Sequence, residues 1–346
     1  STMLFINPHQ PWYGYGQWYE GHIRTEDGVD FYGATFFGSP LLSIGHNQHC
    51  GWSFTVNEPG VVDLWNVRFE SDSPNQYRHG ETLREATVWK QTVKIKGQPT
   101  REYELRKTHH GPILRENNDG TYQACQCARL FEHDTLGQIS LMLRSKTVEE
   151  IRRGMGMLGL PIFNMVAADS QGNILYLYSG AIPKRDLSYD WSQPVDGNDP
   201  RTDWQGFHTV DELPQVMNPP TDYIQSCNST PFTTTDDGNP ARLNFPPYMV
   251  MDQHDDKRRA QISRHLLRNA KDLTLDDFEE LAFNTQIYWA MNELPGLRRH
   301  FANLEANNPE LAESVRPYFQ HFDDWDCTII GECTRSPLCA AWYEEL

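Results

Sequence analysis

The sequence of 346 residues has no apolar run approaching ~20 residues, the length that a membrane-spanning helix needs. Basic residues are also scarce, with 30 lysines and arginines against 47 aspartates and glutamates and a net charge of −17. This balance argues against a nucleic-acid partner, whose phosphates are neutralised by Lys and Arg, and against an anionic membrane surface. The composition favours a solvated acidic exterior.

Cysteines are few, and their spacing is not typical of a metal site. The 7 cysteines include no C-x-x-C pair, which argues against zinc. Cys327 and Cys333 could form a disulfide, which an exported protein would permit, but the sequence leaves this open. We interpret His109 and His110 as a buried or turn pair. The sequence therefore predicts no metal site and no cofactor.

The first half of the chain is predicted to be rich in strands. Glycines punctuate aromatic and aliphatic runs over the first ~70 residues, and polar and apolar residues alternate from about 75 to 130. Turn sequences at 97–99 and 117–120 predict hairpins. We expect a strand-rich subregion at about 64–130.

Helices are predicted mainly in the second half. Thr147 with Glu150, and Thr274 with Asp277, are typical of helix starts, and a further helix is expected at 260–267. Between the predicted helices, residues 184–245 are irregular but carry aromatic residues, which is typical of a functional loop. Strands followed by helices favour an α+β fold.

Three polar clusters follow apolar segments near the start of the chain. Residues 7–12 read Asn-Pro-His-Gln-Pro-Trp and come directly after Met3–Ile6, which we predict to be a buried strand. Residues 45–47 read Gly-His-Asn and lie in a predicted turn, and 52–57 read Trp-Ser-Phe-Thr-Val-Asn. Loops on a rigid sheet commonly deliver polar groups in this way to build a site.

The order and spacing of these clusters resemble the start of the catalytic chain of the penicillin acylase family. This family of N-terminal-nucleophile amidohydrolases includes acyl-homoserine-lactone and aculeacin-type acylases. The resemblance continues over some 325 residues in Thr108–Pro112, the predicted hairpin 164–183, the run from Trp204 to Pro231, and Asp324-Trp325-Asp326. It implies an αββα four-layer sandwich, of which residues 1–346 would form most of the catalytic (beta-chain) domain.

The resemblance also assigns catalytic roles. In the family an N-terminal Ser attacks the amide carbonyl, and its own α-amino group acts as the base. By matching residues, the Val56 N–H and the Asn228 side chain would form the oxyanion hole. His9 would border the nucleophile, and Arg258, or its neighbour Arg259, would orient Asn228. We expect these residues to meet at one site.

The chain departs from the family at its nucleophile. The strand and turn that separate the nucleophilic Ser from the apolar run in the family are missing here, because Ser1 comes just before Met3. We expect a fragment truncated at both ends, whose nucleophile lies upstream and which is inactive alone. Ser1 as the nucleophile of a shortened variant stays open. The resemblance also implies an alpha chain from the same precursor and a periplasmic or secreted location.

Calcium binds near the position of Asp63 in some members of the family. Gly60 offers no carboxylate at the position of the partner ligand, and hard cations need several oxygen ligands. We therefore expect that this loop does not bind calcium, although calcium binding stays open at the level of sequence.

The predicted substrate is a small acyl amide of the acyl-homoserine-lactone, beta-lactam or lipopeptide type. Trp12, Phe31, Trp52 and Phe54 belong to an aromatic cluster that, by resemblance, lines an apolar acyl pocket. Two alternatives are a secreted carbohydrate-active module, in which tryptophans would stack on sugars, and a non-catalytic module. Adjacent acidic pairs such as Glu279 and Glu280 do not face each other on a helix, so the carbohydrate alternative lacks a site.

Overall fold

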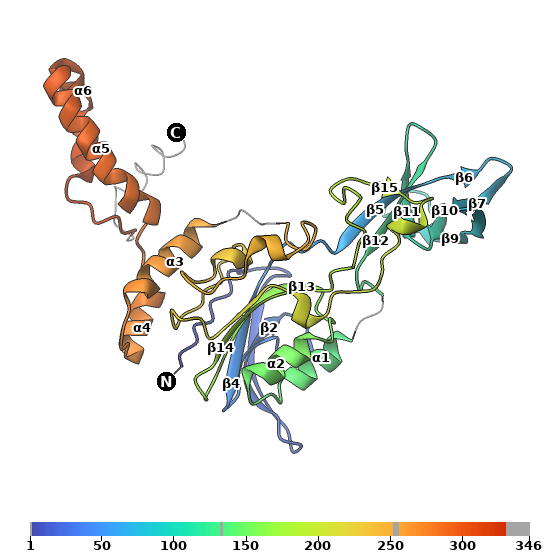
Figure 1. Cartoon of the computed structure of the whole chain (residues 1–346), viewed down its shortest axis with the longest axis horizontal. Helices are drawn as coiled ribbons and strands as arrows, with labels where there is room; N and C mark the ends of the chain where they lie inside the picture. Colours follow the sequence, from blue (N-terminus) through green and yellow to red (C-terminus); the bar gives the residue numbers. More distant parts are fainter. Residues whose placement is uncertain (1, 132–133, 252–255, 330–346) are drawn as a thin grey trace.

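A seven-stranded antiparallel sheet forms the centre of the molecule (Figure 1). The structure is a computed structural model that describes residues 2–131, 134–251 and 256–329. The strands run in the order β1-β2-β3-β4-β13-β14-β16. They are β1 (Trp18–Arg24), β2 (Asp30–Phe36), β3 (Ile44–His46), β4 (Cys50–Thr55), β13 (Ile162–Asp169), β14 (Ile174–Gly180) and β16 (Gln215–Met217). The predicted hairpin at 164–183 is confirmed, because β13 pairs with β14 along its length.

Two short helices, α1 (Thr135–Met142) and α2 (Val148–Met155), pack against this sheet. Helix α2 begins as predicted, since the Thr147 hydroxyl accepts a hydrogen bond from the Glu150 N–H. Its residue Ile151 is fully buried in one core with Trp52 and Met165 of the sheet. Burial of one such aliphatic side chain contributes roughly 1.5–3 kcal/mol, so this interface anchors the central body.

The strand-rich stretch forms two further sheets that extend from the body as an arm (Figure 1). The six-stranded sheet has the order β15-β5-β12-β11-β10-β9, and the three-stranded sheet β6-β7-β8. Their strands are β5 (Val62–Val67), β6 (Phe69–Glu70), β7 (Ser73–His79), β8 (Thr82–Glu85), β9 (Thr87–Val93), β10 (Arg101–Thr108), β11 (Gly111–Glu116), β12 (Tyr122–Cys127) and β15 (Val195–Asp196). The turns predicted at 97–99 and 117–120 join β9 to β10 and β11 to β12.

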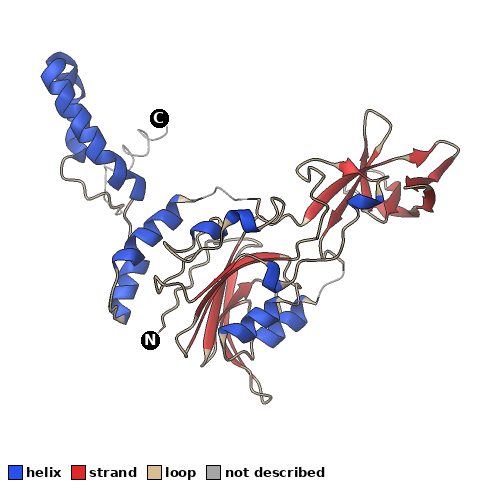
Figure 2. Cartoon of the chain, in the orientation of Figure 1, coloured by secondary structure: helices blue, strands red, loops and turns tan. Residues whose placement is uncertain are grey.

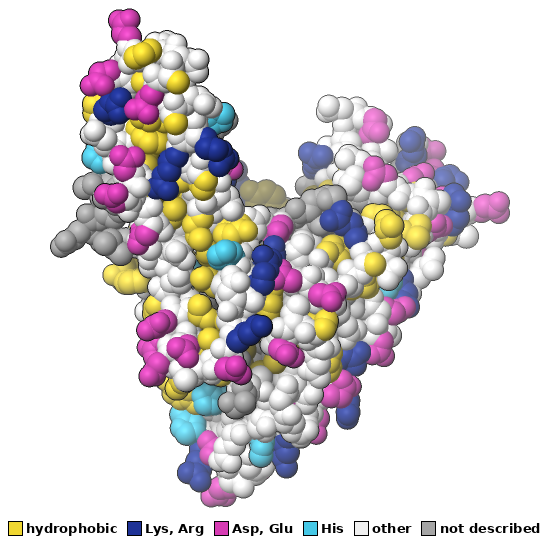
Figure 3. Space-filling view, turned by 60° about the vertical axis from the view of Figure 1, so that its left-hand side comes forward, with side chains coloured by type: hydrophobic (Ala, Val, Ile, Leu, Met, Phe, Trp, Pro, Cys, Tyr) yellow, Lys and Arg dark blue, Asp and Glu magenta, His cyan; other side chains and the backbone are white. Residues whose placement is uncertain are grey.

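The later residues are helical, as Figure 2 shows. The helices are α3 (Arg258–Asn269), α4 (Leu275–Ala282), α5 (Tyr288–Asn307) and α6 (Pro309–Phe319), and the 3₁₀ turns are η1 (Pro200–Thr202), η2 (Val210–Glu212), η3 (Pro231–Thr233), η4 (Arg242–Asn244) and η5 (Gln320–Phe322). The predicted helix at 260–267 and the capping box at Thr274 and Asp277 are confirmed. Helices α5 and α6 form an arm along which hydrophobic side chains gather between charged ones (Figure 3). None of the described helices is long and apolar enough to cross a membrane.

The strand predicted at Met3–Ile6 is wrong. Residues 2–17 contain no strand, and the segment lies over the sheet rather than beside its edge. The close approach of Leu4 to Gly51 of β4 shows this, because a Cβ at Gly51 would lie 3.1 Å from Leu4 Cδ2. With no strand of the described residues beside it, the apolar run packs through its side chains alone. Cys333, proposed as the disulfide partner of Cys327, lies outside the described residues.

Candidate functional site

A cavity of about 1230 Å³ lies between the N-terminal segment, the central sheet, the loop at 220–228 and helices α3 and α4. Its walls are therefore built from regions that are distant in sequence. Apolar residues of the walls include Leu4, Phe5, Trp18, Phe36, Phe54, Phe163, Ile262 and Leu266, and polar ones include His9, Thr55, Ser226, Asn228 and Arg259. A mainly apolar hollow with a few polar groups is the usual form of a small-molecule site.

Asn228 is held at one corner of this cavity from both ends of its side-chain amide. Its Nδ2 donates to the Val56 carbonyl oxygen at 2.9 Å, and its Oδ1 accepts from Arg259 Nη2 at 2.9 Å. Because a guanidinium only donates and a carbonyl only accepts, these partners fix the orientation of the amide. The amide nitrogen has a second hydrogen, and both Asn228 and Val56 line the cavity.

The backbone at Asn228 has a φ of 60°, which few residues other than Gly and Asn adopt readily. The conformation is supported by a chain of side-chain hydrogen bonds that begins in the core. Tyr176 Oη donates to Asn164 Oδ1 at 2.7 Å, and Asn164 Nδ2 donates to Thr55 Oγ1 at 3.1 Å. Thr55 Oγ1 lies 2.7 Å from Ser226 Oγ, two residues before Asn228. This chain ties the loop at Asn228 to the rigid sheet.

The two neighbouring arginines of α3 have different contacts. Arg259 reaches Asn228, whereas the Arg258 guanidinium lies 6.0 Å from the centre of the Trp289 ring. Consecutive helix residues point about 100° apart, so only one of them can face the loop. The structure therefore corrects the choice of Arg258 in favour of Arg259 as the residue that contacts Asn228.

His9 lies on the cavity wall, as part of the N-terminal segment. Its side chain is exposed, and among the described residues no hydrogen bond joins it to Asn228 or Val56. The structure brings His9 to the same cavity as Asn228 and leaves its predicted role beside the nucleophile untested.

Most of the aromatic residues predicted to bind substrate lie elsewhere. Phe31 and Trp52 are fully buried, 4.7 Å apart, in the core under α1 and α2. Trp12 is 85% exposed and is not part of the cavity wall. Of these four residues only Phe54 lines the cavity, where it also contacts Phe163. Phe31 and Trp52 are core residues because the helices cover them.

Cys227 is the thiol nearest in sequence to Asn228, and it also lines the cavity. Burial raises the pKa of this thiol, and the nearby Arg259 opposes the shift without reversing it. A thiol is nucleophilic as its thiolate, so Cys227 is poorly suited to attack a carbonyl. The corner therefore offers hydrogen-bond donors rather than a cysteine nucleophile.

The comparison with known proteins decides the family. A family model described as Penicillin amidase matches residues 1–346. The chain belongs to the penicillin amidase family. It is 25% identical over 332 residues to the acyl-homoserine lactone acylase PvdQ of Pseudomonas fluorescens (strain Pf0-1), covering 85% of this chain and 41% of that protein. It is 28% identical over 234 residues to penicillin G acylase of Escherichia coli, covering 67% and 27%.

The fold is that of a solved penicillin G acylase. The thermostable penicillin G acylase of Alcaligenes faecalis aligns with a TM-score of 0.68 and 20% identity, over 91% of this chain and 54% of that one. The chain spans about 41% of the length of the acyl-homoserine lactone acylase that it matches.

The Asp63 region does not fit calcium in this member of the penicillin amidase family. Asp63 Oδ2 accepts from Arg185 Nε and from Trp204 Nε1, both at 2.6 Å, and Arg185 Nη2 donates to the Gly60 carbonyl oxygen. A guanidinium thus already occupies the carboxylate and the carbonyl that a cation would need. A Cβ at Gly60 would lie 2.2 Å from the Tyr248 carbonyl oxygen, so the loop tolerates no larger ligand residue there.

Sequence reasoning missed several residues that build this site. Thr55, Asn164 and Ser226 form the chain that holds the loop. Asn164 carried a signal, because it is a polar residue within the otherwise apolar run of a buried strand. Ser226 carried none.

Proposed function

We propose that the protein is an amidohydrolase that releases an acyl group from an amide-linked small molecule. The observation that carries this proposal is the corner at which Asn228, Val56 and Arg259 meet on the cavity wall. The nucleophile would be a serine at a chain N-terminus, supplied by a segment outside the described residues. The names of the family members, acyl-homoserine lactone acylase and penicillin G acylase, support the same reaction class.

The proposed reaction uses Asn228 and Val56 as oxyanion donors. The serine Oγ attacks the amide carbonyl, and its α-amine takes the hydroxyl proton and passes it to the leaving amine nitrogen as the C–N bond breaks. A free α-amine has a pKa of about 7.7–8.0, which suits both transfers near neutral pH. The second Asn228 Nδ2 hydrogen and the Val56 N–H would bind the carbonyl oxygen as it becomes negative. Water then releases the acyl group from the serine ester.

Arg259 is proposed to position Asn228 rather than to contact substrate. Its guanidinium holds Oδ1, which keeps Nδ2 directed toward the cavity. In the proposed sandwich, a second sheet and an alpha chain from the same precursor would complete the cavity. We further propose that the protein is exported to the periplasm or secreted.

The acyl group is proposed to be a medium or long aliphatic chain. The cavity wall is apolar over Leu4, Phe54, Phe163 and Leu266, and each buried methylene contributes about 0.8 kcal/mol. The full-length protein should therefore show kcat/KM values that rise with chain length in a series of chromogenic acyl amides. Phenylacetyl and glutaryl amides serve as controls, and a preference for glutaryl would reject the apolar pocket. Release from glycosides but not from amides would reject the proposed function.

Replacing Arg259 by alanine should reduce turnover by loss of positioning. A hydrogen bond to a charged group contributes about 1.5–3 kcal/mol, so kcat/KM should fall about 10–100-fold. Arg258→Ala is the matched control, because Arg258 lies over Trp289. Steady-state kinetics on one acyl amide compares the two variants. A larger loss for Arg258→Ala than for Arg259→Ala would reverse the assignment.

A further inference from the structure

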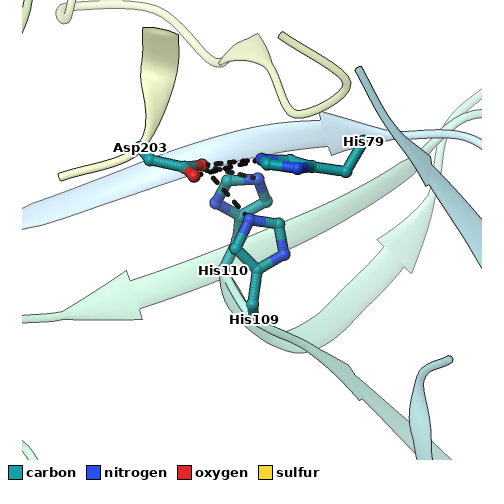
Figure 4. A group of neighbouring side chains, drawn as sticks. All are labelled: His79, His109, His110 and Asp203. Carbon is teal, nitrogen blue, oxygen red and sulfur yellow. Dashed lines mark hydrogen bonds and ion pairs between the residues drawn. The ribbon is translucent and has the colours of Figure 1, made fainter. Parts of the chain in front are cut away.

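A cluster of three histidines and one aspartate lies in the strand-rich arm (Figure 4). His79 ends β7, His109 and His110 form the turn between β10 and β11, and Asp203 follows η1. Three separate segments therefore converge on one point, where the four side chains face one another (Figure 4). One donor atom from each residue lies within 4.8 Å of the other three.

The distances around Asp203 are close to those of a tetrahedral metal site. Its Oδ1 lies 3.2 Å from His79 Nε2, 3.2 Å from His109 Nε2 and 3.8 Å from His110 Nε2. With zinc–ligand bonds of about 2.0–2.1 Å, the donor atoms of a tetrahedron lie about 3.3 Å apart. The other donor separations reach up to 4.8 Å, and the rings of His109 and His110 lie 3.7 Å apart, so the imidazoles must rotate to place all four donors around one ion.

The surroundings hold these side chains in place. His109 Nδ1 lies 2.9 Å from Tyr77 Oη, and the His110 ring stacks on Trp65 with centroids 4.7 Å apart. Asp203 is anchored through both neighbours, because Trp65 Nε1 donates to the Thr202 carbonyl and Trp204 Nε1 donates to Asp63. Outer contacts of this kind orient imidazole ligands and fix their tautomer in metal sites.

Burial leaves the cluster one open side. The side chains of His79 and His110 are 6% and 2% exposed, whereas those of His109 and Asp203 are 25% and 35% exposed. An ion could therefore enter beside His109 and Asp203, and the buried histidines would complete its shell.

We propose that His79, His109, His110 and Asp203 bind a zinc ion that ties the three segments of the strand-rich arm together. The ligand set of three imidazoles and one carboxylate is one that zinc accepts, and its four ligands close the shell. His110 Nε2 lies 3.1 Å from the Gly197 carbonyl oxygen, and the ion would replace this hydrogen bond. The sequence predicts no metal at His109 and His110, because His79 and Asp203 are distant from them in sequence.

Cobalt substitution tests this proposal directly. The full-length protein is stripped with a chelator and titrated with Co²⁺ and Zn²⁺, while absorption, bound metal and melting temperature are measured. We expect one tightly bound Zn²⁺ per chain, a rise in melting temperature, and visible bands of tetrahedral Co²⁺ without a sulfur-to-cobalt charge-transfer band. The absence of a sulfur-to-cobalt band distinguishes binding at the cluster from binding at cysteines such as Cys125 and Cys127. Folded wild-type protein without this spectrum would overturn the proposal.

His109→Gln and Asp203→Asn identify the ligands, because both side chains are partly exposed and the replacements keep hydrogen-bonding groups. Loss of a residue that only hydrogen-bonds to a metal ligand typically lowers metal affinity about 10–100-fold. Loss of a ligand itself should therefore lower zinc affinity by at least about 100-fold. His22→Gln is the matched control, since His22 forms a His–Asp pair at 2.6 Å with Asp30 but no cluster. Wild-type zinc affinity in both cluster variants would show that the four residues form a hydrogen-bonded cluster only.

Discussion

Arg185→Met is expected to lower the free energy of unfolding by about 3–5 kcal/mol, the usual effect of removing one partner of a buried ion pair. The side chains of Arg185 and Asp63 are 1% and 4% exposed, and they meet at 2.6 Å. Without the guanidinium, Asp63 would be a buried carboxyl whose side-chain hydrogen bond within the described part of the chain comes from Trp204. Chemical denaturation of wild type and variant measures the difference. Arg201→Met is the control, because its ion pair with Asp199 is exposed and should contribute less than about 1 kcal/mol.

The loss in Arg185→Met should also depend on pH. Burial already raises the pKa of the Asp63 carboxyl in the folded protein, while Arg185 and Trp204 oppose this shift. Removing Arg185 raises it further, so the folded variant binds a proton that the unfolded chain releases near pH ~3.9. Relative to wild type, the variant should lose stability as pH rises from the pKa of Asp63 in the folded wild-type protein, which burial places above the unfolded value, to the still higher pKa in the folded variant. If the difference in the free energy of unfolding between wild type and variant does not change between pH 4 and 7, Asp63 is not the group left without a partner.

Asn228→Ala is expected to lower kcat of the full-length enzyme by about 10²–10³, the usual effect of removing one oxyanion donor. The substitution removes Nδ2, the donor that the Val56 carbonyl and Arg259 hold beside the cavity. KM should change little, because the interaction strengthens only as charge develops on the carbonyl oxygen. Steady-state kinetics on a chromogenic acyl amide measures both constants.

Two controls accompany this variant. Val56→Ala keeps the backbone N–H and should have a much smaller effect, whereas Asn303→Ala changes an exposed residue of the helical arm and should have none. Equal losses at Asn228 and Val56 would show that the side chains support the loop and that the roles assigned to them are wrong.

Much of the architecture could be predicted from local patterns. The hairpin of β13 and β14, the turns at 97–99 and 117–120, and the start of α2 at Thr147 all follow from short-range chemistry. Asn228 could be placed in the site because the family motif leads directly to it.

The remaining features depend on contacts between distant segments. Phe31 and Trp52 have the composition expected of a pocket wall, but α1 and α2 cover them. The choice between Arg258 and Arg259 depends on which side of α3 faces the loop at Asn228, some thirty residues earlier in the chain. Local sequence patterns do not specify this orientation. Met3–Ile6 has the composition of a strand and forms none, because composition does not provide a pairing partner.

The inhibition constant of an aliphatic boronic acid tests the oxyanion site most directly. Its tetrahedral adduct with a serine places an oxygen where the carbonyl oxygen would develop charge, so it reports on transition-state stabilisation. In the full-length enzyme, Asn228→Ala should weaken boronate inhibition by about the factor by which kcat/KM falls, roughly 10²–10³. An inhibition constant that is the same in wild type and Asn228→Ala would contradict the proposal that the corner formed by Val56, Asn228 and Arg259 stabilises the transition state.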